Sequence, residues 1–248
     1  MKLGQLNDQI NALAPGAQRA YLPSVKPIMC YVGAMTVMQE KLLNAGGALD
    51  KLAALDADIA AAIARFGPPP DRSLPANFDT LARSIIGQQI SRSAATSIWT
   101  RMQEQNLSAA DVIASKSPDI LMLAGLSRRK AEYLIGIADE ITSGRLDLDA
   151  LHGLPGDAVQ ARLVEIRGIG AWTADNFRLF ALGDMDAWPV NDLALQEGMK
   201  RLKQLDERPT AKQMETFGRP WQPYRGAGAL MLWHIYGILV RRATITDI

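Results

Sequence analysis

The sequence has very little cysteine: Cys30 is the single one among 248 residues. One thiol cannot form a disulfide within the chain, and it cannot supply a zinc cluster or a cysteine-bound iron–sulfur cluster. Histidine is nearly as scarce, and His152 and His234 have no partners at metal-ligand spacing. The sequence therefore predicts a protein of a reducing compartment that holds neither an iron–sulfur cluster nor a histidine-bound metal.

Long apolar runs are also missing. No run reaches the roughly 18 residues of a membrane span, and the opening MKLGQLNDQINALAPG lacks the apolar core of a secretory signal. Charge of one sign is missing too, because 27 basic and 26 acidic residues give a formal net charge of +1. Any binding of nucleic acid must then come from local charge and backbone donors rather than from a strongly basic surface.

Apolar residues recur at helical spacing along most of the chain, and we find neither alternating strand patterns nor a fixed-period repeat. The pattern predicts an all-α protein of about ten helices. The clearest expected helices cover residues 49–66, 78–87, 92–102, 128–141, 157–166 and 171–181, one that begins at Asp192, and one from about Tyr224 to Arg241.

Several residues are expected to begin or end these helices. Ser91, Ser108, Ser117 and Ser127 have the side chain and the place of N-caps, and Gly144 is expected to end the helix that follows Ser127. Residues 1–47 are broken by prolines at 15, 23 and 27. We treat residues 1–47 as an N-terminal appendage of uncertain order.

The segment Ile166-Arg167-Gly168-Ile169-Gly170 joins two expected helices and is a helix-hairpin-helix candidate. Gly168 and Gly170 permit positive φ and leave room for a close neighbour, while Ile169 can anchor the turn by packing inward. Such a turn exposes backbone N–H groups at the start of the second helix, and these suit a DNA phosphate. The alternative is a tight turn inside a helical bundle.

The wider pattern resembles a known family. The hairpin with GIGAWTA, followed about twenty residues later by WPVND, resembles the helix-hairpin-helix (HhH-GPD) DNA glycosylase superfamily and, within it, the DNA-3-methyladenine glycosylase II family. Three further segments fit in order and spacing over residues 50–242: IIGQQIS (85–91), GLSRRKAEYL (125–134) and WQPYRGAGALMLW (221–233). The resemblance implies two helical lobes with the active cleft between them.

Asp192 stands where the family keeps its catalytic aspartate. It also precedes LALQEGMKRL as a good helix N-cap, and the two roles are compatible. Helix N–H groups stabilise an ionised carboxylate. A negative charge there would stabilise the oxocarbenium-like state formed when an N-glycosidic bond breaks. Asp175 and Asp186 are the competing carboxylates. Asp175 lies within the second hairpin helix, which favours a structural role, and Asp186 lies in the approach loop, where the family pattern does not select it.

The resemblance also implies the base pocket. Trp172 and Trp233 match aromatic pocket positions, whose faces would attract a cationic alkylated purine; without the family, both tryptophans are equally well core residues. Trp172 also stands where relatives that nick DNA carry a lysine, so no Schiff base can form. Asn176 departs from the pattern, because some relatives have a further aromatic residue there, and the departure bears on the purine preference.

Further residues match DNA contacts of the family. Gln89 matches the side chain that fills the gap left by a flipped nucleotide, with Gln88 and Ser91 in the same segment. Arg128 and Lys130, at a helix start, would meet phosphates. The alternatives are a polar turn between helices and a solvated charged face. Arg225 matches a recurrent arginine that would orient Asp192 or simply hold its helix.

The sequence therefore predicts a glycosylase domain over residues 48–248, with one lobe of residues 77–184 and another of 48–76 plus 185–248. It would be a monofunctional enzyme of base excision repair that releases 3-methyladenine, and in second place 7-methylguanine, from double-stranded DNA. A monovalent cation, Na⁺ or K⁺, on the carbonyls of residues 166–170 is the one cofactor considered.

The expected protein is a monomer, cytoplasmic and nucleoid-associated in a bacterium or nuclear in a eukaryote, without a membrane partner. Three alternatives stay open. One is a glycosylase for another damaged base, such as hypoxanthine or uracil. The second is a non-catalytic helix-hairpin-helix module that grips DNA, and the third is a helical interaction protein with no DNA role.

Overall fold

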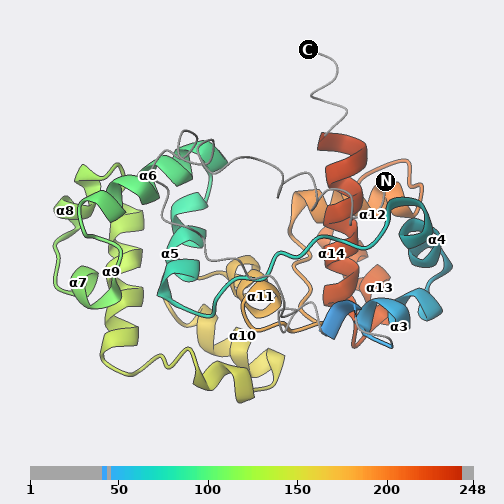
Figure 1. Cartoon of the computed structure of the whole chain (residues 1–248), viewed down its shortest axis with the longest axis horizontal. Helices are drawn as coiled ribbons and strands as arrows, with labels where there is room; N and C mark the ends of the chain where they lie inside the picture. The colour runs from blue at the N-terminus through green and yellow to red at the C-terminus, as the bar shows by residue number, and fades with distance from the viewer. Residues whose placement is uncertain (1–40, 44–45, 242–248) are drawn as a thin grey trace, which may run out of the picture. The chain divides into compact units, whose positions relative to one another are not determined.

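The computed structural model describes residues 41–43 and 46–241. Within these residues the regular secondary structure is entirely helical (Figure 1), which confirms the expected all-α class. None of the described helices combines the length and the apolar character that a membrane span requires. The helices are α3 (Ala48–Leu55), α4 (Ala57–Phe66), α5 (Phe78–Gly87), α6 (Arg92–Glu104), α7 (Ala110–Ala114), α8 (Pro118–Leu123), α9 (Arg128–Thr142), η2 (Ala150–Gly153), α10 (Gly156–Val164), α11 (Ala171–Phe180), α12 (Leu193–Leu202), α13 (Ala211–Gly218), η3 (Arg219–Trp221), α14 (Arg225–Tyr236) and η4 (Gly237–Arg241).

Two of the four serines predicted as N-caps are confirmed by side-chain bonds to the first turn of their helix. Ser91 accepts from the N–H of Ala94, and Ser127 accepts from the N–H of Lys130. Ser117 precedes α8 but makes no capping bond through its side chain. The prediction for Ser108 is wrong, because α7 begins two residues later and Ala109 holds its N-cap position.

The prediction of one helix over residues 49–66 is also wrong. Asp56 has an extended conformation (φ −140°, ψ 112°) and separates α3 from α4. Its carboxylate caps α4 by accepting from the N–H of Asp58, and it also accepts from Lys203 and from the indole N–H of Trp221. An apolar period alone cannot reveal such a break, because the phase of the pattern is almost unchanged across it.

Helix α13 was not foreseen. It begins with a capping box in which Thr210 and Gln213 exchange side-chain and backbone hydrogen bonds. The sequence carries this signal as T-A-K-Q, which is one of the recognised patterns of a helix start. The last predicted helix is confirmed in position, although it changes from α14 to the π-helical turns of η4 at Gly237.

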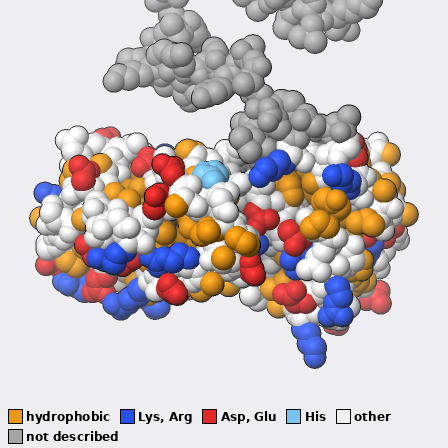
Figure 2. All heavy atoms as spheres, turned by 90° about the horizontal axis from the view of Figure 1, so that it is seen from below, with side chains coloured by type: hydrophobic (Ala, Val, Ile, Leu, Met, Phe, Trp, Pro, Cys, Tyr) orange, Lys and Arg blue, Asp and Glu red, His pale blue; other side chains and the backbone are white. Residues whose placement is uncertain are grey.

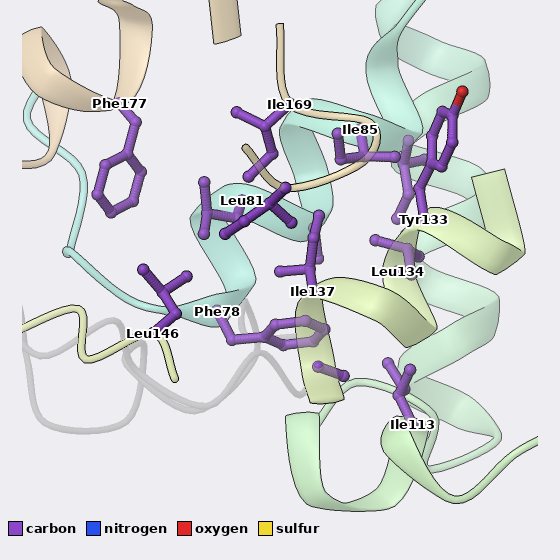
Figure 3. Packing of buried hydrophobic residues seen from close by; sticks show 14 of the residues in the cluster. Phe78, Leu81, Ile85, Ile113, Tyr133, Leu134, Ile137, Leu146, Ile169 and Phe177 are labelled. Carbon is purple, nitrogen blue, oxygen red and sulfur yellow. The ribbon is translucent and has the colours of Figure 1, made fainter. Parts of the chain in front are cut away.

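Two hydrophobic clusters form the core of the described part of the chain. The first draws its members from a continuous stretch, Phe78 to Leu182, on α5–α11. In it the hairpin residue Ile169 points toward Leu81 of α5 (Figure 3). The second cluster combines residues 42–62 of α3, α4 and the segment before them with residues 179–235. Leu42 belongs to it and is only 1% exposed, although it lies in the segment 1–47 that the sequence set apart.

Helix α11 belongs to both clusters. Phe177 is packed in the first cluster and Leu179 in the second. In Figure 1, α11 lies between the helices α5–α9 and the helices α12 and α14. Because α11 follows directly on the hairpin, it positions residues from the hairpin beside residues that come from the second cluster.

Candidate active site

Asp192 precedes α12, where its carboxylate both caps the helix and accepts hydrogen bonds from two tryptophans. Its Oδ1 accepts from the N–H of Leu195 at 2.8 Å, which is the predicted N-cap bond. The same Oδ1 accepts from the indole Nε1 of Trp233 at 3.0 Å. Its Oδ2 accepts from the indole Nε1 of Trp172 at 2.9 Å. The carboxylate is therefore fixed by three donors from three helices, and it is half-buried.

The two tryptophans differ in exposure. Trp233 is 7% exposed and packs in the second cluster, with Phe180 stacked on its ring at a centroid distance of 5.3 Å and an interplanar angle of 28°. Trp172 is 39% exposed. The structure thus brings both predicted pocket residues to Asp192, one as a buried support and one with an open surface.

A cavity of about 390 Å³ lies next to Trp172. Its walls include Trp172, Asn176 and Phe180 of α11, the N-cap Asn77 of α5 and polar residues of α5 such as Ser84. The volume lies within the range of ligand pockets, and an apolar wall with a few polar groups is typical of them. The Asn176 amide donates to the carbonyl of Trp172 at 2.6 Å.

The competing carboxylates are paired with arginines. Asp175 is 5% exposed and accepts from Arg178 at 2.8 Å and from Gln160 at 2.9 Å. Burial raises the pKa of Asp175 to about 6, although Arg178 beside it acts in the opposite direction. Asp186 binds the fork of Arg225 through both oxygens, at 2.8 and 2.6 Å, and it raises the pKa of that guanidinium.

Arg225 therefore binds the loop that precedes Asp192 and does not bind Asp192 itself. Its bonds fix Asp186 in the loop that leads to Asp192 and join this loop to the start of α14. Of the two roles considered from the sequence, these contacts favour the one in which the arginine holds its helix.

The hairpin has one crowded and one open glycine. Gly168 has φ +101°, and a Cβ there would lie 2.5 Å from the ring of Tyr133. Gly170 has φ −91°, so it does not need the positive φ that the sequence allowed, and a Cβ there would meet no atom within 4 Å. Gly170 is exposed and caps α11 without a side chain, which leaves the first N–H groups of α11 accessible.

Ile169 packs in the first cluster and is 3% exposed. The hairpin carbonyls are partly engaged: Ile166 accepts from Ile169, Gly168 from Gln88, and Gly170 from Ala174. The cation considered for residues 166–170 stays a prediction. Among the described residues, no group of three His, Cys, Asp or Glu side chains is placed to hold a metal ion.

The turn between α5 and α6 lies against the hairpin. Gln88 is half-buried, and its Nε2 donates to Gly168 O at 3.2 Å and approaches Thr173 Oγ1 at 3.5 Å. Gln89 is exposed and has φ +58°, a left-handed conformation that few residues other than glycine adopt. Ser91 closes the turn as the N-cap of α6.

The basic start of α9 lies beside this turn. Arg128 is exposed and pairs with Asp119 of α8 at 2.5 Å. Lys130 turns its ammonium inward, to the carbonyls of Ile86 at 2.7 Å and Gln88 at 2.6 Å. The structure therefore brings the hairpin, the turn and the start of α9 together.

A larger cavity, about 570 Å³, lies elsewhere and is lined by residues such as Lys51, His152 and Tyr224. None of the described candidate site residues lines it.

The sequence missed three features of the site. It treated the tryptophans as stacking faces and did not foresee that both donate to Asp192. It did not single out Phe180 as the ring that covers Trp233. It gave no reason for Lys130 to bind carbonyls. Only the first had a signal, because a buried indole N–H needs an acceptor.

Comparison with known proteins supplies the context. The family described as HhH-GPD superfamily base excision DNA repair protein matches residues 82–223. A DNA-3-methyladenine glycosylase of Bacillus subtilis is 27% identical over 175 residues, which cover 65% of this chain and 58% of the relative. The chain spans 58% of the length of the first curated relatives that it matches.

Two solved structures are similar to the chain. A DNA-3-methyladenine glycosidase of Bacillus halodurans has a TM-score of 0.71 and 32% identity, over 78% of this chain and 91% of that one. A 3-methyladenine DNA glycosylase of Schizosaccharomyces pombe, in complex with abasic DNA, has a TM-score of 0.67 and 28% identity, over 75% of this chain and 94% of that one.

Proposed function

Because this chain belongs to the HhH-GPD superfamily of base excision DNA repair proteins, we propose that it is a DNA glycosylase. Its substrates are alkylated purines in duplex DNA, chiefly 3-methyladenine and in second place 7-methylguanine. The observation that carries the proposal is the Asp192 carboxylate, which is held at the start of α12 by the indole N–H groups of Trp172 and Trp233. The related proteins and solved structures support the substrate class by their names.

Asp192 acts on the sugar. As the bond between C1′ and the base nitrogen breaks, its electron pair leaves with the base and positive charge develops at C1′ and the ring oxygen. The Asp192 carboxylate stabilises this charge electrostatically. Water then adds to C1′ and loses a proton. Because three donors fix the carboxylate before the reaction, little reorganisation is needed when the charge appears.

The base is held beside Trp172. Alkylation at N3 or N7 makes a purine cationic, and the π-face of Trp172 attracts a cation by about 0.5 to 2 kcal/mol. The cation also departs as a neutral base, which makes it a better leaving group than an unmodified purine. The cavity of about 390 Å³ next to Trp172 offers the space for a flipped base.

DNA is gripped through backbone groups. The open Gly170 lets a phosphate approach the first N–H groups of α11. The exposed Gln89 stands on the neighbouring turn, where it would occupy the gap left by the flipped nucleotide.

The reaction ends at an abasic site. The side chain two residues after Gly170 is Trp172, which has no amine and so cannot form a Schiff base with C1′. We therefore propose that the enzyme has no lyase activity.

A second candidate function is the removal of a neutral damaged base such as hypoxanthine. Asn176 favours it, because an amide in the cavity wall offers hydrogen bonds in place of a further aromatic face.

The test is single-turnover base release from methylated duplex DNA by the native protein, by Asp192→Asn and by the control Asp206→Asn, an exposed aspartate. Asparagine keeps the N-cap of α12, so the variant should fold and bind DNA. We expect Asp192→Asn to lower the release rate by about 100-fold or more, with Asp206→Asn unchanged.

The products separate the remaining alternatives. Strand breaks should form only after alkali, and borohydride should trap no covalent complex. Release of hypoxanthine but not of 3-methyladenine would favour the second candidate. Tight duplex binding with no release of any base would instead indicate a non-catalytic DNA-binding module.

A further inference from the structure

The ammonium group of Lys130 binds backbone carbonyls of the protein itself. Its Nζ donates to the carbonyls of Ile86 and Gln88, at 2.7 and 2.6 Å. These carbonyls lie at the end of α5, where the last C=O groups of a helix lack intrahelical partners. Burial lowers the pKa of Lys130, and two of its three ammonium donors are already used. A lysine in this state is poorly placed to bind a phosphate as well.

The carbonyl of Gln88 belongs to the peptide that leads into Gln89. Gln89 has φ +58°, in the left-handed region. For a residue with a β-carbon this conformation costs on the order of 1 kcal/mol, and it persists only where the surroundings hold it. Lys130 therefore holds the residue before Gln89 in the place that makes this turn.

The hairpin supplies the second support. The side chain of Gln88 donates to Gly168 O at 3.2 Å. Gly168 in turn packs on Tyr133, which lies three residues after Lys130 on α9. The turn is thus held from α9 by Lys130 and from the hairpin by Gln88, while Gln89 is left exposed.

We propose that Lys130 and Gln88 are positioning residues which hold Gln89 in the geometry that enters the duplex, and that Lys130 is not a phosphate contact. This inference rests on the proposed function, in which Gln89 fills the gap left by a flipped nucleotide. Lys130 and Gln88, which the sequence predicted as DNA contacts, then support Gln89 instead. The hairpin that grips a phosphate and the turn that fills the gap then act as one unit.

The test measures insertion without catalysis. The duplex carries an abasic-site analogue with 2-aminopurine opposite the gap, and the fluorescence of 2-aminopurine reports whether a side chain enters. The variants are Lys130→Met, which keeps the chain length but removes all donors, and Gln88→Met. The control is Lys116→Met, an exposed lysine between α7 and α8 that loses the same charge.

We expect Lys130→Met and Gln88→Met to lose the fluorescence change that Gln89→Ala also loses. The double variant Lys130→Met/Gln89→Ala should match Gln89→Ala alone, because Lys130 acts through Gln89. Single-turnover base release by Lys130→Met should fall by on the order of 10- to 100-fold at saturating protein. The slope of log affinity for undamaged duplex against log salt should match that of Lys116→Met.

Other outcomes would overturn the proposal. A slope reduced by about 0.9 relative to the control, with release at saturating protein unchanged, would make Lys130 a phosphate contact. Additive effects in the double variant would show that Lys130 does not act through Gln89. If Lys130→Met does not fold in a thermal unfolding check, Gln88→Met carries the same expectations. Absence of base release by the native protein would count against the proposed function alone, because insertion at an abasic site does not require catalysis.

Discussion

The edges of two indole rings determine how Asp192 is held. The sequence indicated Trp172 and Trp233 as pocket aromatics, and a polar edge on each ring was foreseeable because an indole N–H in a protein interior needs an acceptor. Which carboxylate oxygen each ring reaches depends on how α11, α12 and α14 pack. No local pattern encodes that packing, so the sequence could point to these three residues but not to the hydrogen bonds between them.

A buried carboxyl at position 175 should make stability depend on pH. Burial raises the pKa of Asp175 from the ordinary 3.8 to about 6. Between these values the folded protein binds more protons than the unfolded chain, so the free energy of unfolding falls as pH rises through this window. A difference of about 2 in pKa between the folded and unfolded states changes the free energy of unfolding by about 3 kcal/mol at most.

The Asp175→Asn variant cannot ionise at this position. Relative to this variant, the free energy of unfolding of the native protein should fall by up to about 3 kcal/mol between pH 4 and pH 7. Urea unfolding of both proteins at four pH values across this range measures the difference, with the exposed Asp206→Asn as a control. Two curves that run parallel from pH 4 to pH 7 would show that the Asp175 carboxyl is not perturbed by folding.

At the scale of elements, the sequence located a helix start correctly where the N-cap residue itself forms the capping hydrogen bond. Ser91, Ser127 and Asp192 do this. Asp56 resembles any other surface aspartate in the sequence, and besides capping α4 it binds Lys203, 147 residues away. That contact is a property of the folded chain, which explains why one long helix was predicted.

The two hairpin glycines should respond differently to alanine. Gly168→Ala forces a β-carbon onto Tyr133 at positive φ, and we expect a loss of about 1 to 3 kcal/mol in the free energy of unfolding. Gly170→Ala meets open space at an ordinary φ, so its stability should change by less than about 1 kcal/mol. Its methyl group instead obstructs a phosphate at the start of α11, and DNA affinity should fall.

Urea unfolding gives the stabilities, and fluorescence anisotropy with an abasic duplex gives the affinities. Each glycine serves as the control for the other, because the same methyl group is added two residues apart. Native affinity in Gly170→Ala would rule out a phosphate at this end of the hairpin. An unchanged stability in Gly168→Ala would mean that Tyr133 can move aside.

At the scale of the whole molecule, charge is balanced rather than concentrated. The formal net charge is +1, and on the face drawn in Figure 2 basic and acidic side chains lie among one another. Several cations near the hairpin are also engaged within the protein, such as Arg128 with Asp119 and Arg167 with Glu132. The composition alone predicted that a basic surface would not drive binding, but not which cations are paired.

Binding to duplex DNA should therefore depend only moderately on salt. We expect log affinity against log salt to have a slope of magnitude below about 4, because the proposed grip uses backbone N–H groups, which neutralise fewer phosphate charges than lysines or arginines would. Fluorescence anisotropy titrations with undamaged duplex, at salt concentrations from about 50 to 200 mM, measure the slope. A magnitude of about 6 or more would reveal many phosphate contacts and contradict the view that backbone donors provide the grip.

The two clusters are assembled from the chain in different ways. All members of the first lie between Phe78 and Leu182, whereas the second needs residues near position 42 and residues as late as Ile235. A ribosome delivers the chain from its N-terminus, so every member of the first cluster is made while the second still lacks its larger part. Trp233 is the last donor to Asp192 to be synthesised. The hairpin is therefore complete in the nascent chain well before the carboxylate beside it has all of its partners.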